Sequence, residues 1–135
     1  MARSLSDHEI TSYDVIAPAL AARIRIMKVP VLPPHVDGMT FGPYILLRSD
    51  DERLRQGDRT LLAHEMVHVR QYAELGLVGF LTQYLKSYLK NLVRVRNHRQ
   101  AYLDIPQEVE ARKIAERWAR ARQDRPTAST DDGPM

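Results

Sequence analysis

The sequence contains no cysteine and no long apolar run, and each absence excludes a class of protein. Without cysteine, the chain can form neither a disulfide framework nor a thiolate metal site, so metal ligands must be nitrogen or oxygen atoms. No apolar run approaches the length of a membrane span, and the opening MARSLSDHEI lacks the apolar core of a secretory signal. We therefore expect a cytoplasmic protein.

Length and charge favour one small, mildly basic domain. The chain has 135 residues, a formal net charge of +3 and a pI of about 9.4. This length is sufficient for a single modest core, and the charge is too small to predict a nucleic-acid partner. We expect one domain over residues 1–123 and a disordered tail, DRPTASTDDGPM, over residues 124–135.

The periodicity of the apolar residues predicts strands before helices. The stretch ARIRIMKVPVLP alternates apolar and charged positions and predicts a strand. Residues 38–48 are rich in β-forming types but are broken by Gly42 and Pro43, so this strand should lie at a sheet edge or carry a bulge. A helix that stops at Gly76 and a last helix that ends near Gln123 should follow.

Between these two helices, residues 80–97 predict an amphipathic helix with a basic outer face. Apolar pairs recur every fourth residue, with Lys86, Lys90 and Arg94 between them. Amphipathic helices of this kind more often pack their apolar face against the protein, so we expect this face to cover the preceding helix and the lysines to face water. The same pattern also suits a membrane surface, so peripheral membrane contact stays open.

The stretch LLAHEMVHVRQY contains the spacing His-Glu-x-x-His. On an α-helix His64 and His68 project from one face and can bind one zinc ion. Glu65 lies about 100° round the helix, where it can act as general base toward a zinc-bound water. This spacing predicts a hydrolytic zinc site.

Catalytic zinc usually takes three protein ligands, so a third must come from elsewhere in the chain. Glu108 shares a helical face with Ala111 and Trp118 and should point toward the core, where a carboxylate needs a counter-charge. Glu110 shares its face with Lys113 and suggests a solvated ion pair. We choose Glu108 over Glu110 as the third ligand.

These motifs resemble those of a known group of metallopeptidases. His64-Glu65-x-x-His68, followed on a later helix by the glutamate of EVEA, resembles the gluzincin pattern, in which a small residue stands three positions after the third ligand. More closely, LLAHEMVHVRQY with AYLDIPQEVEAR resembles the compact prokaryotic minigluzincins, metallopeptidases of uncharacterised role. The resemblance spans residues 29–122.

The resemblance implies an α+β, zincin-like fold. A short mixed β-sheet would pack on an active-site helix, beside the long amphipathic helix and a C-terminal helix that carries the ligand glutamate. It implies that residues 38–48 align a peptide substrate at the sheet edge. It also implies zinc on His64, His68 and Glu108, with Glu65 as general base.

The supporting residues follow less directly from the sequence. Tyr102 is the best candidate for stabilising the oxyanion, with His98 and Tyr84 behind it. Arg112 stands where gluzincins often have an acidic or amide residue, so a familiar partner of the site is missing. Gln71 shares the face of the two histidines and is either a supporting residue or a surface amide.

These features lead to two functional hypotheses. The first is a zinc metalloendopeptidase that hydrolyses peptide bonds of a peptide or protein substrate, with Glu65 and Tyr102 as catalytic residues. The alternative is a zincin-fold module that binds peptides or partners with little catalytic activity. A protein that only bound a membrane or nucleic-acid surface through residues 80–97 would not need His64, Glu65 and His68, so their presence argues against this third hypothesis.

Overall fold

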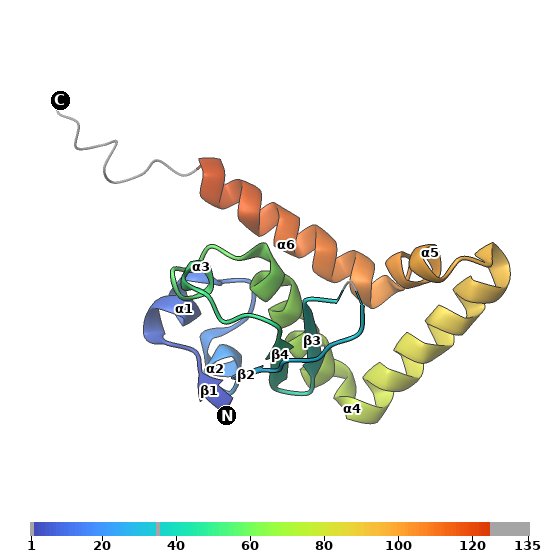
Figure 1. The fold of residues 1–135 in the computed structure, drawn as a ribbon, viewed down its shortest axis with the longest axis horizontal. Coiled ribbons are helices and arrows are strands. Elements are labelled where there is room, and N and C mark those ends of the chain that lie inside the picture. The colour runs from blue at the N-terminus through green and yellow to red at the C-terminus, as the bar shows by residue number, and fades with distance from the viewer. Residues whose placement is uncertain (1, 35, 125–135) are drawn as a thin grey trace.

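The computed structural model describes residues 2–34 and 36–124, which form the predicted α+β fold (Figure 1). A small sheet and three short helices come first, and three further helices follow within the described residues. The elements are β1 (Ala2–Ser4), α1 (Asp7–Ser12), α2 (Pro18–Ala21), β2 (Arg25–Lys28), β3 (Gly38–Phe41), β4 (Tyr44–Leu47), α3 (Glu52–Arg55), α4 (Thr60–Val95), α5 (His98–Leu103) and α6 (Pro106–Asp124).

The sheet is mixed and has the strand order β1-β2-β4-β3. β2 and β4 pair in parallel, whereas β1 and β3 pair antiparallel to their neighbours. The prediction of one strand over residues 38–48 is wrong in detail, because this stretch is a hairpin. Gly42, with a φ of 62°, and Pro43 form its turn, and a positive φ is the backbone conformation that glycine adopts most readily. Of the two strands of the hairpin, β3 lies at an edge of the sheet and β4 does not.

The core lies between the sheet, the first half of α4 and α6. Ile26 of β2, Ile45 of β4 and Met66 of α4 are almost fully buried in it. α6 contributes Trp118, whose indole stacks on Tyr13 with ring centroids 5.2 Å apart. These contacts hold α6 along the first half of α4, as Figure 1 shows. The face of α6 that the sequence assigned to the core is therefore the buried one.

Gly76 divides α4 into two helices that meet at a kink. Its φ of 77° and ψ of 163° lie in a region that only glycine adopts without strain. Three aromatic rings bridge the kink: Phe80 stacks on Tyr72 at 3.8 Å and on Tyr84 at 5.5 Å between ring centroids. The sequence placed the end of the motif helix at this glycine, and the chain continues from it in a new direction.

After the kink, residues 77–95 form a helix that we call the arm, and it extends away from the sheet (Figure 1). Phe80 is buried, but Leu85, Leu89 and Val93 are 57%, 50% and 75% exposed. The expectation that this apolar face covers the active-site helix is therefore half right, because Phe80 stacks on Tyr72 of that helix whereas the leucines and Val93 face solvent. Because the backbone turns at Gly76, only one side of the face packs inward.

Two further expectations concern membrane-spanning helices and the C-terminal tail. No helix within residues 2–34 and 36–124 has both the length and the hydropathy needed to cross a bilayer. Of the predicted tail, Asp124 is the last residue of α6, and the remaining residues, 125–135, lie outside the described residues.

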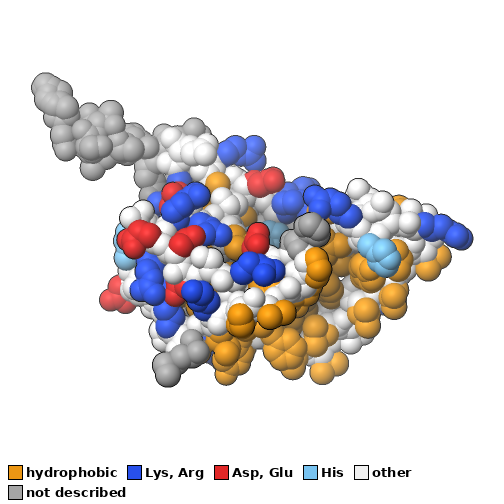
Figure 2. Space-filling view, viewed as in Figure 1, with side chains coloured by type: hydrophobic (Ala, Val, Ile, Leu, Met, Phe, Trp, Pro, Cys, Tyr) orange, Lys and Arg blue, Asp and Glu red, His pale blue; other side chains and the backbone are white. Residues whose placement is uncertain are grey.

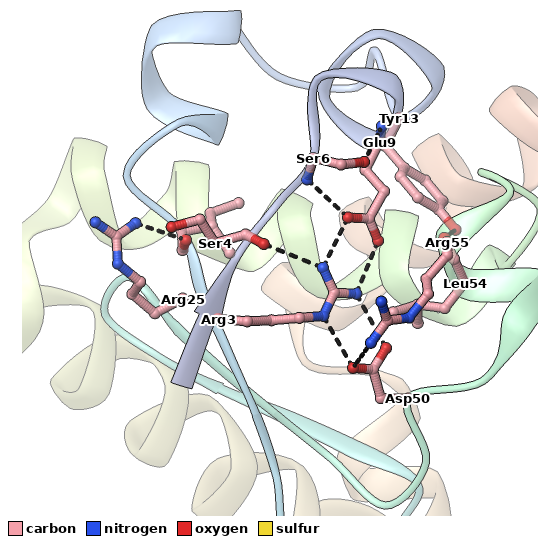
Figure 3. A network of polar contacts seen from close by, with 10 residues as sticks. Arg3, Ser4, Ser6, Glu9, Tyr13, Arg25, Asp50, Leu54 and Arg55 are labelled. Carbon is pink, nitrogen blue, oxygen red and sulfur yellow. Dashed lines mark hydrogen bonds and ion pairs between the residues drawn. The ribbon is translucent and has the colours of Figure 1, made fainter. Parts of the chain in front are cut away.

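Arg3 joins three segments at the N-terminal end of the sheet (Figure 3). Its guanidinium donates to both carboxylate oxygens of Glu9, at 2.8 and 2.9 Å, and to both of Asp50, at 2.9 and 3.0 Å. Burial opposes ionisation of Glu9, but Arg3 and the Ser6 amide more than offset it and lower its pKa. The bond from Arg3 likewise lowers the pKa of Asp50. The network thus stabilises β1 against α1 only while both carboxylates are ionised.

We predict that Arg3→Gln lowers the free energy of unfolding by about 3 kcal/mol at neutral pH, because it leaves the buried Glu9 carboxylate without a counter-charge. Both folded-state pKa values lie below the ordinary 4.5 and 3.8. The contribution is therefore complete above about pH 5 and is lost as the pH falls through the lowered values. Denaturant unfolding across this range should show the two proteins converging at low pH. Arg53→Gln, at an exposed ion pair, is the control. An equal loss at every pH would contradict the prediction.

We also predict that Gly76→Ala destabilises the fold by about 2 kcal/mol, because alanine is strained at this φ and ψ. Gly79→Ala is the matched control: this glycine lies within the arm, and an added Cβ would make an ordinary contact, 3.6 Å from Leu75 Cβ. In a helix, alanine stabilises by about 0.5–1 kcal/mol relative to glycine. Thermal unfolding should therefore shift in opposite directions for the two variants, and matching shifts would exclude a special role for Gly76.

Candidate metal centre

Three candidate ligands meet where α4 and α6 cross. His64 and His68 lie one turn apart on α4, and Glu108 lies in the first turn of α6. Nε2 of His64 is 2.9 Å from Oε1 of Glu108, and Nε2 of His68 is 3.2 Å from the same oxygen. The structure thus brings together the three residues that the sequence singled out as ligands.

This group fits a metal ion in both geometry and chemistry. Its two imidazole nitrogens and one carboxylate oxygen all lie within 4.8 Å of one another. Donor atoms on a tetrahedral zinc ion are separated by about 3.3 Å, given zinc–nitrogen and zinc–oxygen bonds of about 2.0–2.1 Å. Small shifts of the side chains would place all three donors on one ion. The donor set suits zinc and several other first-row metals.

Gln71 determines which nitrogen of His68 carries a proton. The side-chain NH2 of Gln71 donates to the Gln107 carbonyl at 3.1 Å and to Glu110 Oε1 at 2.7 Å. The amide oxygen of Gln71 must therefore be the atom that faces His68 Nδ1, at 2.7 Å, and it accepts a hydrogen bond from the N–H at that position. Burial opposes protonation of His68, but Glu108 raises its pKa, and the protonated ring donates from Nε2 to Glu108 at 3.2 Å. In the neutral imidazole, with its proton held on Nδ1 by Gln71, the lone pair of Nε2 is free for a metal ion. Gln71 is 3% exposed, so it is a supporting residue and not a surface amide.

Glu110 lies outside the ligand group. Its exposed carboxylate forms an ion pair with Arg70 at 2.8 Å and accepts the hydrogen bond from Gln71. The sequence placed Glu110 on a solvated face, and it is indeed exposed, but its ion-pair partner comes from α4. The partner could not be read from the spacing on α6, because the pairing joins two helices.

Glu65 lies beside the candidate ligands and is held by the edge strand. The hydroxyl of Thr40 in β3 lies 2.8 Å from Glu65 Oε1 and 3.1 Å from the Glu65 carbonyl oxygen. Glu65 is only 5% exposed, and burial raises its pKa although His68, His64 and Thr40 act in the opposite direction. A Cβ at Gly38 would make an ordinary contact with Glu65 Cγ, at 3.5 Å, and a tight one with Leu47 Cδ2 of the neighbouring strand, at 3.0 Å.

Two tyrosines approach Glu108 in different ways. The hydroxyl of Tyr84, in the arm, donates to Glu108 Oε2 at 2.5 Å. Tyr102 is 42% exposed and lines the clefts on both sides of the site. Burial and the charge of Glu108 raise the pKa of both phenols. The sequence ranked Tyr84 behind Tyr102, and only the kink at Gly76 brings Tyr84 to the ligand. The sequence contains one weak indication of this position: Tyr84 follows Phe80 by four residues, so the two rings lie on one face of the helix.

The candidate ligands open onto a groove between the edge strand and the arm. Burial of Glu108 opposes its ionisation, but hydrogen bonds from His64 and His68 lower its pKa, so a carboxylate is present at the floor of the groove. The groove is lined by Gly38, Thr40 and Phe41 of β3, by Glu65 and His68 of α4, and by Phe80 and Tyr84 of the arm. His98 lines the neighbouring cleft, with its Nδ1 2.6 Å from the Tyr88 hydroxyl.

Comparison with known proteins gives one match. A family model described as the eCIS core domain matches residues 33–76, and this domain is associated with zincin-like metallopeptidase-like proteins. The matched segment contains β3, β4, α3 and the part of α4 that carries His64, Glu65 and His68, and it ends at the kink. Glu108 lies beyond it. No curated protein and no solved structure matches the chain.

We predict that Glu108→Ala loses bound metal whereas Glu110→Ala retains it. Only the first substitution removes a donor atom from the group that lies within 4.8 Å. Metal content of the purified proteins, measured by mass spectrometry beside wild type and His68→Ala, tests this. Circular dichroism should confirm that each variant is folded. Loss of metal in Glu110→Ala with retention in Glu108→Ala would reverse the ligand assignment.

Proposed function

We propose that this protein is a zinc-dependent metallopeptidase of the gluzincin type. The observation that carries the proposal is the convergence of two imidazoles and one carboxylate beside a second, buried carboxylate. His64, His68 and Glu108 would hold the ion, and Glu65 would act next to it. The match to the eCIS core domain over residues 33–76 supports a metallopeptidase-like module.

The proposed site would use the ion and the protein for different tasks. When bound, zinc polarises a carbonyl group and lowers the pKa of a water molecule that it holds. The chain supplies an N,N,O donor set whose geometry is maintained by Gln71 behind His68 and by Tyr84 behind Glu108. Because both supporting side chains bond to a ligand, they limit its rotation when substrate binds.

Glu65 would be the general base and then the general acid. Its carboxylate takes a proton from the water that attacks the peptide carbonyl carbon. When the carbon–nitrogen bond breaks, Glu65 transfers this proton to the leaving amine nitrogen. Burial raises the pKa of Glu65, so the carboxylate is a stronger base than one in water. The hydroxyl of Thr40 holds the carboxylate in place.

Tyr102 would stabilise the oxyanion of the tetrahedral intermediate. The hydroxyl of Tyr84 already donates a hydrogen bond to Glu108, so it is not free to donate one to a substrate. Tyr102 lines both clefts and is partly exposed, so it can turn toward a substrate. Its raised pKa keeps the phenol protonated at neutral pH and therefore able to donate.

β3 would align an extended peptide substrate. It is the last strand of the sheet and pairs only with β4 among the described residues. An extended chain can add to such an edge through backbone hydrogen bonds. β3 also lines the groove that contains Glu65 and His68, so a peptide bound there would pass directly over the site.

A binding module with little catalytic activity is the second candidate, and Arg112 favours it. This residue takes the place of a familiar acidic or amide partner of the site, and its guanidinium donates to the Leu103 carbonyl at 2.9 Å. Arg112 thus links α5 to α6. Such a module would bind peptides in the groove with metal present and would leave them intact.

We predict that Glu65→Gln retains the metal but lowers peptide hydrolysis by about 10²–10⁴-fold, because an amide cannot accept the proton from water. Cleavage of a broad peptide library by the metal-loaded protein, analysed by mass spectrometry, measures this loss. Glu74→Gln, on an exposed side chain of the same helix, should cleave like wild type. Undiminished activity in Glu65→Gln would exclude the mechanism. Peptide binding without cleavage by wild type would favour the binding module.

A further inference from the structure

The arm, residues 77–95, carries a row of exposed apolar side chains that the proposed chemistry does not use. We call this row the apolar stripe. Its members are at least 40% exposed: Val78 75%, Leu81 40%, Leu85 57%, Leu89 50% and Val93 75%. At 100° per residue they lie within an arc of about 120°. Figure 2 shows hydrophobic side chains gathered along this part of the molecule. An apolar surface of this kind marks an interaction site.

Basic residues border the apolar stripe along one side. Lys86, Lys90 and Arg94 occupy the next arc of about 80° round the helix. Lys86 and Lys90 form no ion pair within the described residues, and Arg94 lies 3.9 Å from Asp104. Residues 75–103 contain no Asp or Glu at all. The arm therefore combines apolar contact area with uncompensated positive charge.

The apolar surface continues from the arm toward the β3–β4 hairpin. Leu81 of the apolar stripe and Phe41 of β3 line the same groove, and Phe41 is 51% exposed. Tyr44, just after the hairpin turn, is 45% exposed. The exposed apolar area thus includes residues of the arm, β3 and β4, and it reaches the groove that Leu81 and Phe41 line.

We propose that the arm is an interfacial element that docks this protein on an anionic lipid bilayer. A helix with an apolar face and lysines beside it lies in the plane of a membrane, with its apolar side chains among the acyl chains and its cations near the headgroups. The arm has this arrangement, and no helix of the described residues is suited to crossing the bilayer. The protein would lie on the surface with the mouth of its groove close to the lipid.

Charge and shape favour a bilayer over two other occupants. A second copy of the arm would bring together two acid-free segments, and their like charges would repel. A folded acidic protein would need a groove to receive a helix that extends from the body of the molecule (Figure 1). A bilayer interface accepts such a helix without a preformed groove and supplies negative charge on all sides.

Vesicle flotation with the full chain tests the proposal. Wild type should bind vesicles of phosphatidylcholine mixed with phosphatidylglycerol, should bind pure phosphatidylcholine vesicles much more weakly, and should be released by added salt. Leu85→Gln with Leu89→Gln should weaken binding at least about tenfold, because two apolar side chains no longer enter the interface. These leucines are exposed, so circular dichroism should show an unchanged fold.

A charge-matched pair of variants separates the arm from general basicity. Lys86→Gln with Lys90→Gln should weaken binding to the anionic vesicles by about thirtyfold. Lys113→Gln with Arg117→Gln removes the same charge from exposed positions of α6 and should have a much smaller effect. Equal effects of the two pairs would overturn the proposal.

Two other outcomes would also overturn it. One is the absence of vesicle binding by wild type together with binding of a soluble acidic amphipathic peptide, which would assign the apolar stripe to a protein partner. The other is a wild-type dimer in sedimentation velocity that becomes a monomer in Leu85→Gln with Leu89→Gln, which would assign it to a second copy. Glu65→Gln should bind vesicles like wild type, so failure of the proposed hydrolysis leaves this test intact.

Discussion

The buried carboxylate of Glu108 is the constraint on which the arrangement of the helices depends. Removing a carboxylate from water is costly unless hydrogen-bond donors or cations surround it, and here three partners come from the two halves of α4. His64 and His68 reach it from the first half of α4, and Tyr84 reaches it from the arm. One side chain on α6 thus determines where both halves of α4 must lie.

Gly76 makes this arrangement possible. A straight α4 would carry Tyr84 about twelve residues, or roughly 18 Å, beyond the level of Tyr72 along one axis. The kink turns the arm, and the rings of Tyr72, Phe80 and Tyr84 stack across it. The same turn has a second effect: it brings one face of the arm to the site and leaves the apolar stripe outside. Chemistry at the groove and the proposed membrane contact are therefore linked through one backbone position.

Local periodicity predicted β2, the two parts of α4 that meet at Gly76, and α6. The spacing of His64 and His68 places them on one helical face, and the position of Glu108 relative to Trp118 placed it toward the core. These are properties of single helices, so they can be read from the chain. The hairpin within residues 38–48 and the exposure of one side of the arm's apolar face were not predicted, because each depends on a glycine with positive φ whose effect on chain direction has no periodic signature.

Helical geometry relates residues a few positions apart, so the motif helix and the core-facing side of Glu108 could be predicted from the chain, whereas the α+β fold class was implied by the resemblance to the minigluzincins. Contacts between elements were needed to show that Gln71 orients His68, that Tyr84 bonds to Glu108 and that the apolar stripe is exposed. These depend on contacts between elements, and such contacts follow from the angle at which whole helices meet.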